Sequence, residues 1–133
     1  KQDPHGAYAA VIPLFVKAAK EGVSPIINGD GNFSRDFTYV ENAVSANILA
    51  LFTENVLAVN EVFNIACGQS NSINQLWKLI CSNLNISIPP TYGSYRTGDI
   101  PHSLANIDRA IEILNYKVEV DFEKGIHKLI ELL

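Results

Sequence analysis

Two arginines stand close to aspartates in polar, turn-rich stretches of the sequence. Arg35 directly precedes Asp36, and Arg96 lies shortly before Asp99. A guanidinium group presents a planar fork of N–H donors that matches phosphate oxygens bidentately, so two arginines on separate loops can bind a diphosphate. The Asp99 carboxylate could accept hydrogen bonds from the hydroxyls of a ribose or a sugar. The alternative is that both arginines form ordinary surface ion pairs with these aspartates, which are common.

Other chemistries find little support in the spacing of the residues. His5, His102 and His127 are scattered and lack a paired spacing such as H-x-x-x-H, which predicts structural or surface roles rather than metal binding. Neither a G-x-S-x-G nucleophile elbow nor a Tyr-x-x-x-Lys pair occurs. Residues 29–34 nearly match the phosphate loop G-x-G-x-x-G, but β-like rather than helical sequence follows them, so this match is predicted to be misleading.

The segment that must position Arg35 is residues 26–40. Two apolar β-formers lead into Asn28-Gly29, a strong turn dipeptide because both residue types tolerate positive φ. Gly31 adds a second permissive position, and a second β-like run ends at Val40. The pattern predicts a hairpin-like loop between two short strands, with Arg35 presented near its exit.

Helices are predicted on both sides of this loop. Apolar residues recur at helical spacing over residues 8–22, with Gly22 as the stop. Residues 41–53 form a second helix that is apolar almost all round, so it should be largely buried or covered by a partner. Ser72 and Gln75 form a capping box for a third helix, and Asn106 and Asp121 can cap two more.

Two further short strands complete the prediction. Residues 62–66 are nearly continuously apolar, which is typical of a strand buried on both faces. Residues 91–95 form the other candidate, followed by a polar loop over residues 96–103. The alternation of helices with short strands predicts a mixed α/β fold.

Composition limits the possible partners. The 133 residues suffice for one domain, and a net charge of −4 argues against nucleic acid while permitting a small phosphorylated ligand. Cys67 and Cys81 form no framework, so free thiols in a reducing cytoplasm are expected. No apolar run is long enough for a membrane span, and no signal peptide is visible. The absence of any methionine indicates a piece of a longer protein.

Four motifs carry a family resemblance that covers nearly the whole chain. The motifs are, in order, Gln2-Asp3-Pro4-x-Gly6-Ala7-Tyr8-Ala9-Ala10-Val11-Ile12-Pro13, Ile27-Asn28-Gly29-Asp30-Gly31-x-x-Ser34-Arg35-Asp36-Phe37, Val62-Phe63-Asn64-Ile65-Ala66 and Arg96-x-Gly98-Asp99-x-x-His102-Ser103. With these motifs the sequence resembles the C-terminal part of extended short-chain dehydrogenase/reductase sugar-nucleotide epimerases, and is most similar to the UDP-N-acetylglucosamine 4-epimerase group.

The resemblance implies roles for individual residues. Arg35 and Arg96 would hold the diphosphate of a UDP-sugar, and Asp99 would hold the ribose. The backbone at Ala10 and Val11 would contact the uracil, and Ser103 would lie near the nucleotide-sugar contacts that close the site. One departure is Ile26, where the family often has an aromatic residue able to stack on uracil.

The resemblance also implies what the chain lacks. Family members bind NAD through an N-terminal Rossmann half, which also carries the catalytic Tyr-x-x-x-Lys pair, and neither feature occurs in this sequence. The fragment alone is therefore expected to be inactive and to hold no cofactor, within a parent that is a cytoplasmic, homodimeric, NAD-dependent UDP-sugar 4-epimerase. Two alternatives remain open, namely a sugar-nucleotide 4,6-dehydratase or decarboxylase of the same superfamily and a non-catalytic sugar-nucleotide binding module.

Overall fold

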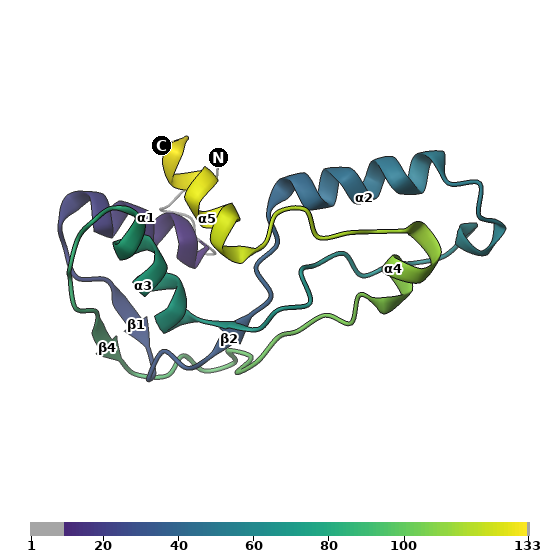
Figure 1. Cartoon of the computed structure of the whole chain (residues 1–133). Helices are drawn as coiled ribbons and strands as arrows, with labels where there is room; N and C mark the ends of the chain where they lie inside the picture. The colour runs from purple at the N-terminus through teal and green to yellow at the C-terminus, as the bar shows by residue number, and fades with distance from the viewer. Residues whose placement is uncertain (1–9, 133) are drawn as a thin grey trace. The chain divides into compact units, whose positions relative to one another are not determined.

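The computed structural model describes residues 10–132, which divide into two compact units built from discontinuous segments (Figure 1). Unit 1 comprises residues 10–33, 72–101 and 126–132, and unit 2 comprises residues 34–71 and 102–125. The C-terminal helix α5 (Phe122–Glu131) begins in unit 2 and ends in unit 1. The chain therefore crosses between the units several times.

Unit 1 packs two helices beside a small parallel sheet. Helix α1 (Val11–Glu21) ends at Gly22, whose φ of 69° is the left-handed conformation expected of a glycine stop. Helix α3 (Ile73–Asn83) begins with the predicted capping box, in which Ser72 and Gln75 bond each other's backbone. The rings of Phe15 and Trp77 meet edge to face, with their centroids 5.5 Å apart, and join the two helices in a buried core.

The predicted hairpin around Arg35 is wrong. Strand β1 (Ile26–Asn28) pairs in parallel with β4 (Thr91–Gly93), whereas β2 (Ser34–Arg35) pairs with β3 (Asn71–Ser72). The turn itself is present, because Gly29 and Gly31 have φ values of 69° and 74°. Its backbone groups bond Gly93 and Asn74 instead of a returning strand, so the loop runs from one small sheet to the other.

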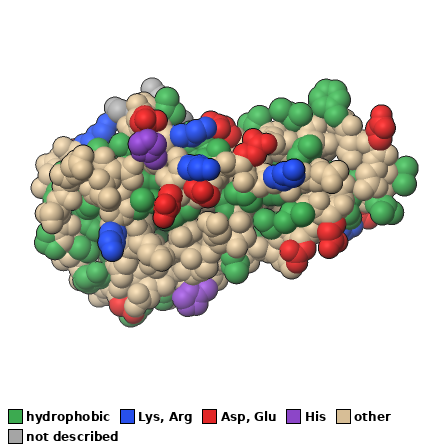
Figure 2. Space-filling view, viewed as in Figure 1, with side chains coloured by type: hydrophobic (Ala, Val, Ile, Leu, Met, Phe, Trp, Pro, Cys, Tyr) green, Lys and Arg blue, Asp and Glu red, His purple; other side chains and the backbone are tan. Residues whose placement is uncertain are grey.

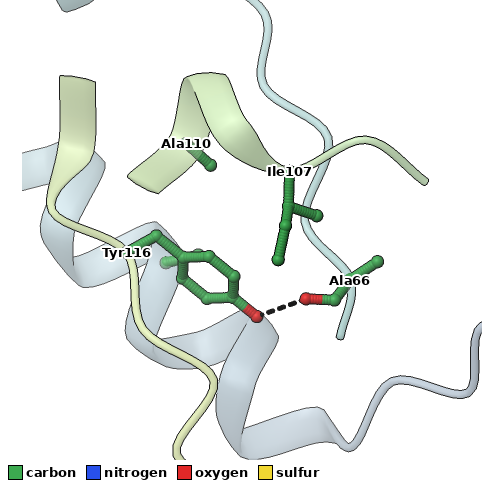
Figure 3. Close-up of a cluster of buried hydrophobic side chains, with 5 residues drawn as sticks. Ala66, Ile107, Ala110 and Tyr116 are labelled. Carbon is green, nitrogen blue, oxygen red and sulfur yellow. Dashed lines mark hydrogen bonds between the residues drawn. The ribbon is translucent and has the colours of Figure 1, made fainter. Parts of the chain in front are cut away.

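Unit 2 is built from helix α2 (Val40–Phe52), the short 3-10 helix η1 (Val56–Ala58) and helix α4 (Asp108–Leu114). Its core contains Ala46, Ala66, Ile107, Ala110 and Tyr116 (Figure 3). The side chain of Asn42 is fully buried, where its Nδ2 donates to the carbonyl of Val120 and its Oδ1 accepts from two backbone N–H groups of residues 119 and 120. A buried amide thus fastens the start of α2 to the segment before α5.

The predicted helix caps are only partly confirmed. Asp121 accepts from the backbone N–H of Lys124 at the start of α5, as expected. Asn106 accepts from the backbone N–H of Asp108, but the cap position of α4 is the following residue, Ile107. The helix therefore begins one residue later than the sequence predicts.

The predicted strand at residues 62–66 is also wrong. This segment has no regular structure, and Val62 is 82% exposed. Within residues 10–132 no strand lies beside it to satisfy its backbone groups, and a strand without a partner does not form. The apolar sequence of residues 62–66 is nevertheless typical of a strand that is buried on both faces.

Helix α2 is buried less than its apolar sequence predicts. Only Asn42 and Ala46 of this helix are buried, whereas Val44, Ile48 and Leu51 are exposed. Figure 2 shows hydrophobic side chains at the surface along α2 and around η1. Within the described residues, no helix has the length and apolar character needed to cross a bilayer.

Candidate functional site

Arg35 and Ser103 meet at one backbone oxygen. The Nη1 of Arg35 donates to the carbonyl oxygen of Ser34 over 2.8 Å, and the backbone N–H of Ser103 donates to the same oxygen over 3.1 Å. Arg35 is half-buried on β2 and makes further contacts, whereas Ser103 is exposed. The structure therefore brings together two of the residues that the sequence analysis singled out.

The neighbouring Asp36 organises the backbone around β2. Its two carboxylate oxygens accept hydrogen bonds from the backbone N–H groups of Cys67 at 3.0 Å and Gly68 at 2.9 Å, with a longer contact from Ala105 at 3.4 Å. A carboxylate that accepts several backbone N–H groups makes strong, charge-assisted hydrogen bonds. Asp36 thus fixes two loops beside Arg35, a role that the sequence analysis did not foresee.

A chain of side-chain hydrogen bonds runs through buried Ser34. The hydroxyl of Ser70 donates to the Ser34 hydroxyl over 2.8 Å, and Ser34 Oγ lies 2.9 Å from His102 Nδ1. Ser34 and His102 also form an isolated parallel bridge. His102 is thus held against Ser34, a contact that was not predicted.

Arg96 and Asp99 lie on one turn of unit 1. The backbone N–H of Asp99 donates to the carbonyl of Arg96 over 3.2 Å, and Gly98 takes a φ of 87° within the turn. Arg96 is exposed and Asp99 half-buried, and within residues 10–132 neither side chain has a hydrogen bond or ion pair. The alternative of a surface ion pair between Arg96 and Asp99 is therefore not observed.

Ala10 and Val11 form the start of α1. Ala10 is the N-cap residue with extended backbone, φ −67° and ψ 147°, and Val11 is the first helical residue. Ala10 has no polar side-chain atom to cap the helix, and it makes no side-chain cap hydrogen bond. This position suits contacts from backbone rather than from side chains.

The structure thus forms two groups of the predicted site residues, one in each unit. Arg35 lies with Ser103 in unit 2, and Arg96 lies with Asp99 in unit 1. The joint action of Arg35 and Arg96 on one diphosphate remains a prediction. Ile26, at the position discussed for the base, is 71% exposed on β1.

The pKa values of Asp30 and Cys67 are shifted from their ordinary values. The pKa of Asp30 is lowered chiefly by hydrogen bonds from the backbone and side chain of Asn32. Burial raises the pKa of the Cys67 thiol, and the nearby Asp36 carboxylate raises it further. Cys67 and Cys81 are both free and buried, as the sequence predicts for free thiols.

The described residues form neither a metal cluster nor a dinucleotide-binding loop that leads into a helix. Among the described residues, no cluster of three or more His, Cys, Asp or Glu side chains could hold a metal ion. The glycine-containing loop at residues 29–34 leads into β2, as predicted, and not into a helix whose N-terminus could receive a pyrophosphate. The described residues therefore do not fit NAD through a loop of this kind.

Comparison with known proteins decides the family. Residues 1–66 match the family model described as "NAD dependent epimerase/dehydratase family". The chain belongs to this family. The assignment agrees with the sequence resemblance.

Curated relatives align with almost the whole length of this epimerase/dehydratase chain. A putative UDP-glucose 4-epimerase of Methanocaldococcus jannaschii is 35% identical over 98% of this chain and 40% of its own length. A UDP-N-acetyl-alpha-D-glucosaminuronate decarboxylase of Bacillus cytotoxicus is 33% identical over 95% of this chain and 40% of its own length. The chain therefore spans about 40% of the length of these curated relatives.

A solved structure of the family confirms the fold. The UDP-N-acetylglucosamine 4-epimerase of Methanobrevibacter ruminantium, in complex with UDP-N-acetylmuramic acid, is 40% identical to this chain with a TM-score of 0.87. The alignment covers 98% of this chain and 41% of that protein. The predicted mixed α/β fold is thus confirmed for this epimerase/dehydratase chain.

Proposed function

We propose that this chain is the UDP-sugar-binding part of an NAD-dependent nucleotide-sugar C4 epimerase. Its substrate pair would be UDP-GlcNAc and UDP-GalNAc, or UDP-glucose and UDP-galactose. The observation that carries the proposal is the shared bonding of Arg35 and Ser103 to the Ser34 carbonyl, in a chain that is 40% identical to a UDP-N-acetylglucosamine 4-epimerase. A guanidinium held in this way is suited to bind phosphate oxygens.

The residues of this chain would bind and orient the substrate without reacting. Arg35 and Arg96 would neutralise the diphosphate, and Asp99 would accept hydrogen bonds from the ribose hydroxyls. The backbone at Ala10 and Val11, where α1 begins, would contact the uracil. NAD, bound by the N-terminal half of such a protein, would supply hydride transfer at C4, so the fragment alone would not epimerise a sugar.

The apolar surface of unit 2 fits this proposal. Val44, Ile48 and Leu51 lie at helical spacing on α2 and are exposed, and residues 62–66 carry a buried-strand pattern without a neighbouring strand. We propose that the NAD-binding half of the protein covers both segments, because the relatives are about two and a half times as long as this chain. The 62–66 segment would then join its sheet.

Ligand titration tests the proposed binding. Isothermal titration of this chain with UDP, CDP and dTDP should show the tightest binding for UDP. Arg35→Ala should weaken UDP binding by roughly ten- to a hundredfold, because a charge-assisted hydrogen bond contributes about 1.5–3 kcal/mol. Arg109→Ala is the matched control, since Arg109 is an exposed arginine of the same unit that pairs with Glu61.

Two results would reject the binding proposal. One is UDP binding no tighter than inorganic phosphate, which would show that neither base nor diphosphate geometry is recognised. The other is the lack of a specific effect of Arg35→Ala. Its UDP affinity could be unchanged, or Arg109→Ala could lose as much affinity, and an equal loss would show a general charge effect. Circular dichroism of each variant controls for folding.

A decarboxylase or a 4,6-dehydratase of the same family is the second candidate. The 33% identity to a UDP-N-acetyl-alpha-D-glucosaminuronate decarboxylase favours the decarboxylase. The coding sequence upstream of this chain separates the dehydratase from the epimerase, because a dehydratase should show an acidic pair beside its Tyr-x-x-x-Lys site. Tighter binding of a UDP-uronic acid than of UDP-GlcNAc would favour the decarboxylase.

A further inference from the structure

The hydrogen-bond chain through Ser34 places a hydroxyl group beside Nδ1 of His102. A serine hydroxyl has one proton to donate and two lone pairs to accept. The Ser34 hydroxyl accepts from Ser70, and its oxygen lies 2.9 Å from His102 Nδ1, to which it can donate its own proton. A neutral imidazole whose Nδ1 accepts must carry its proton on Nε2. Donation from Ser34 to Nδ1 would thus hold His102 as the Nε2–H tautomer.

This Nε2–H group is available to a ligand. His102 is exposed, and within residues 10–132 no acceptor bonds its Nε2. The side-chain oxygen of Ser34 holds His102, while its backbone oxygen holds Arg35 and Ser103. The buried Ser34 therefore contacts the guanidinium group of Arg35, the imidazole ring of His102 and the backbone N–H of Ser103.

We propose that His102 donates a hydrogen bond from Nε2–H to a phosphate oxygen of the same nucleoside diphosphate that Arg35 binds. This inference rests on the proposed function and adds a phosphate-binding residue to it. Ser34 and Ser70 are positioning residues, because they orient the ring and set its tautomer without touching the ligand. A neutral N–H donor beside an arginine adds a further hydrogen bond to the phosphate oxygens.

Nitrogen-15 NMR of the imidazole groups tests this proposal directly. In the free chain, the His102 signals should be those of the Nε2–H tautomer, with assignment from their loss in His102→Gln. Addition of UDP or of pyrophosphate should shift the His102 Nε2 and its proton, whereas uridine should leave them in place. A free chain with the Nδ1–H tautomer would overturn the proposal.

Substitutions separate phosphate binding from a purely structural role. His102→Asn keeps a polar atom near the Nδ1 position and removes the donor at Nε2, so UDP affinity should fall about five- to twentyfold. His102→Gln places an amide N–H near the Nε2 position and should recover most of this loss. His127→Asn is the control, because His127 is an exposed histidine whose Nδ1 bonds the side chain of Asn83.

Each outcome distinguishes this inference from the proposed function. If UDP binding depends on Arg35 but His102→Asn leaves it unchanged, the proposed function stands and the role of His102 is rejected. If His102→Asn weakens UDP and uridine equally, the histidine only supports the fold and the inference is rejected. If pyrophosphate shifts His102 but UDP binds no better than pyrophosphate, the phosphate site stands and the UDP-sugar assignment fails. If neither ligand shifts His102, the inference is rejected.

Discussion

The phenolic hydroxyl of Tyr116 donates a 2.9 Å hydrogen bond to the carbonyl oxygen of Ala66 within the core of unit 2 (Figure 3). Tyr116 is only 1% exposed, and Ala66 is the last residue of the apolar 62–66 segment. The bond holds the end of that segment in place although no strand lies beside it in the described residues. Because the buried Ala66 carbonyl cannot bond water, it depends on the Tyr116 hydroxyl for its hydrogen bond.

Tyr116→Phe should therefore destabilise unit 2. The change leaves the Ala66 carbonyl without its partner, which costs about 1–3 kcal/mol in a buried site. Urea unfolding followed by far-ultraviolet circular dichroism measures the loss. Tyr92→Phe is the control, since the Tyr92 hydroxyl bonds Asn74 at an exposed position and should cost less than about 0.5 kcal/mol. Equal losses in the two variants would contradict the prediction.

Asn42→Ala should be the more damaging change in unit 2. Its amide bonds the backbone N–H groups of Glu119 and Val120 and the Val120 carbonyl, and the residue is fully buried. Loss of these bonds should lower the free energy of unfolding by about 2–4 kcal/mol. Asn47→Ala on the exposed side of α2 is the comparison, and a similar effect there would show that α2 tolerates no substitution. The sole tryptophan, Trp77, reports separately on unit 1 through its fluorescence.

Gly29→Ala should destabilise unit 1 through two separable effects. A Cβ at this position would lie 2.2 Å from the Tyr95 ring, and φ is +69°. Positive φ costs a non-glycine residue about 1–2 kcal/mol, and the clash adds to it. Gly98→Ala isolates the backbone effect, because φ is +87° there and no atom lies within 4 Å of the added Cβ. Trp77 fluorescence during urea unfolding should show a larger loss for Gly29→Ala, and equal losses would rule out the clash.

Stability should fall in alkaline solution, partly because of Cys67. Burial raises the pKa of this thiol above 9.0, so in the folded state it stays protonated at a pH where the unfolded chain has begun to ionise. The unfolded state then binds fewer protons, and the free energy of unfolding decreases as pH rises above 9.0. Denaturation under reducing conditions on both sides of this pH should show a smaller alkaline loss for Cys67→Ala. An identical pH dependence in the two proteins would contradict the cause.

The exposed apolar face of α2 should make the isolated chain associate with itself. Ile48→Glu places a charge in the middle of this face and should shift the chain towards monomer in sedimentation and reduce the binding of an apolar dye. Asn47→Glu adds the same charge at the adjacent exposed position and should have little effect. A wild-type chain that stays monomeric without binding the dye would contradict the proposal that this face is normally covered.

Local features of the fold were predictable from sequence because their causes are local. The Gly22 stop, the Ser72–Gln75 capping box and the turn at Gly29 depend on residues that lie close together in the chain. The pairing of strands was not predictable in this way. Strand β1 pairs with β4 across some sixty residues of sequence, and residues 62–66 have no partner within the described chain.

The candidate site shows the same division. The sequence pointed to Arg35 because a lone arginine in a turn-rich segment is conspicuous. It did not reveal Ser34 as the centre of the site, since a buried serine is recognised only by what it bonds. Arg35 and Ser103 lie close together because both donate to the backbone carbonyl of Ser34, and such a contact cannot be recognised in the sequence.

The interleaving of the two units has a consequence for biosynthesis. The Asn42 amide finds its partners in residues 119 and 120, and unit 1 includes residues from both ends of the described chain. A ribosome releases the chain from its N-terminus, so unit 2 cannot close before residues 102–125 have emerged, and unit 1 cannot close before residues 126–132 have emerged. Both units are therefore completed almost together, which predicts that a nascent chain stopped near residue 100 is recognised by chaperones as unfolded.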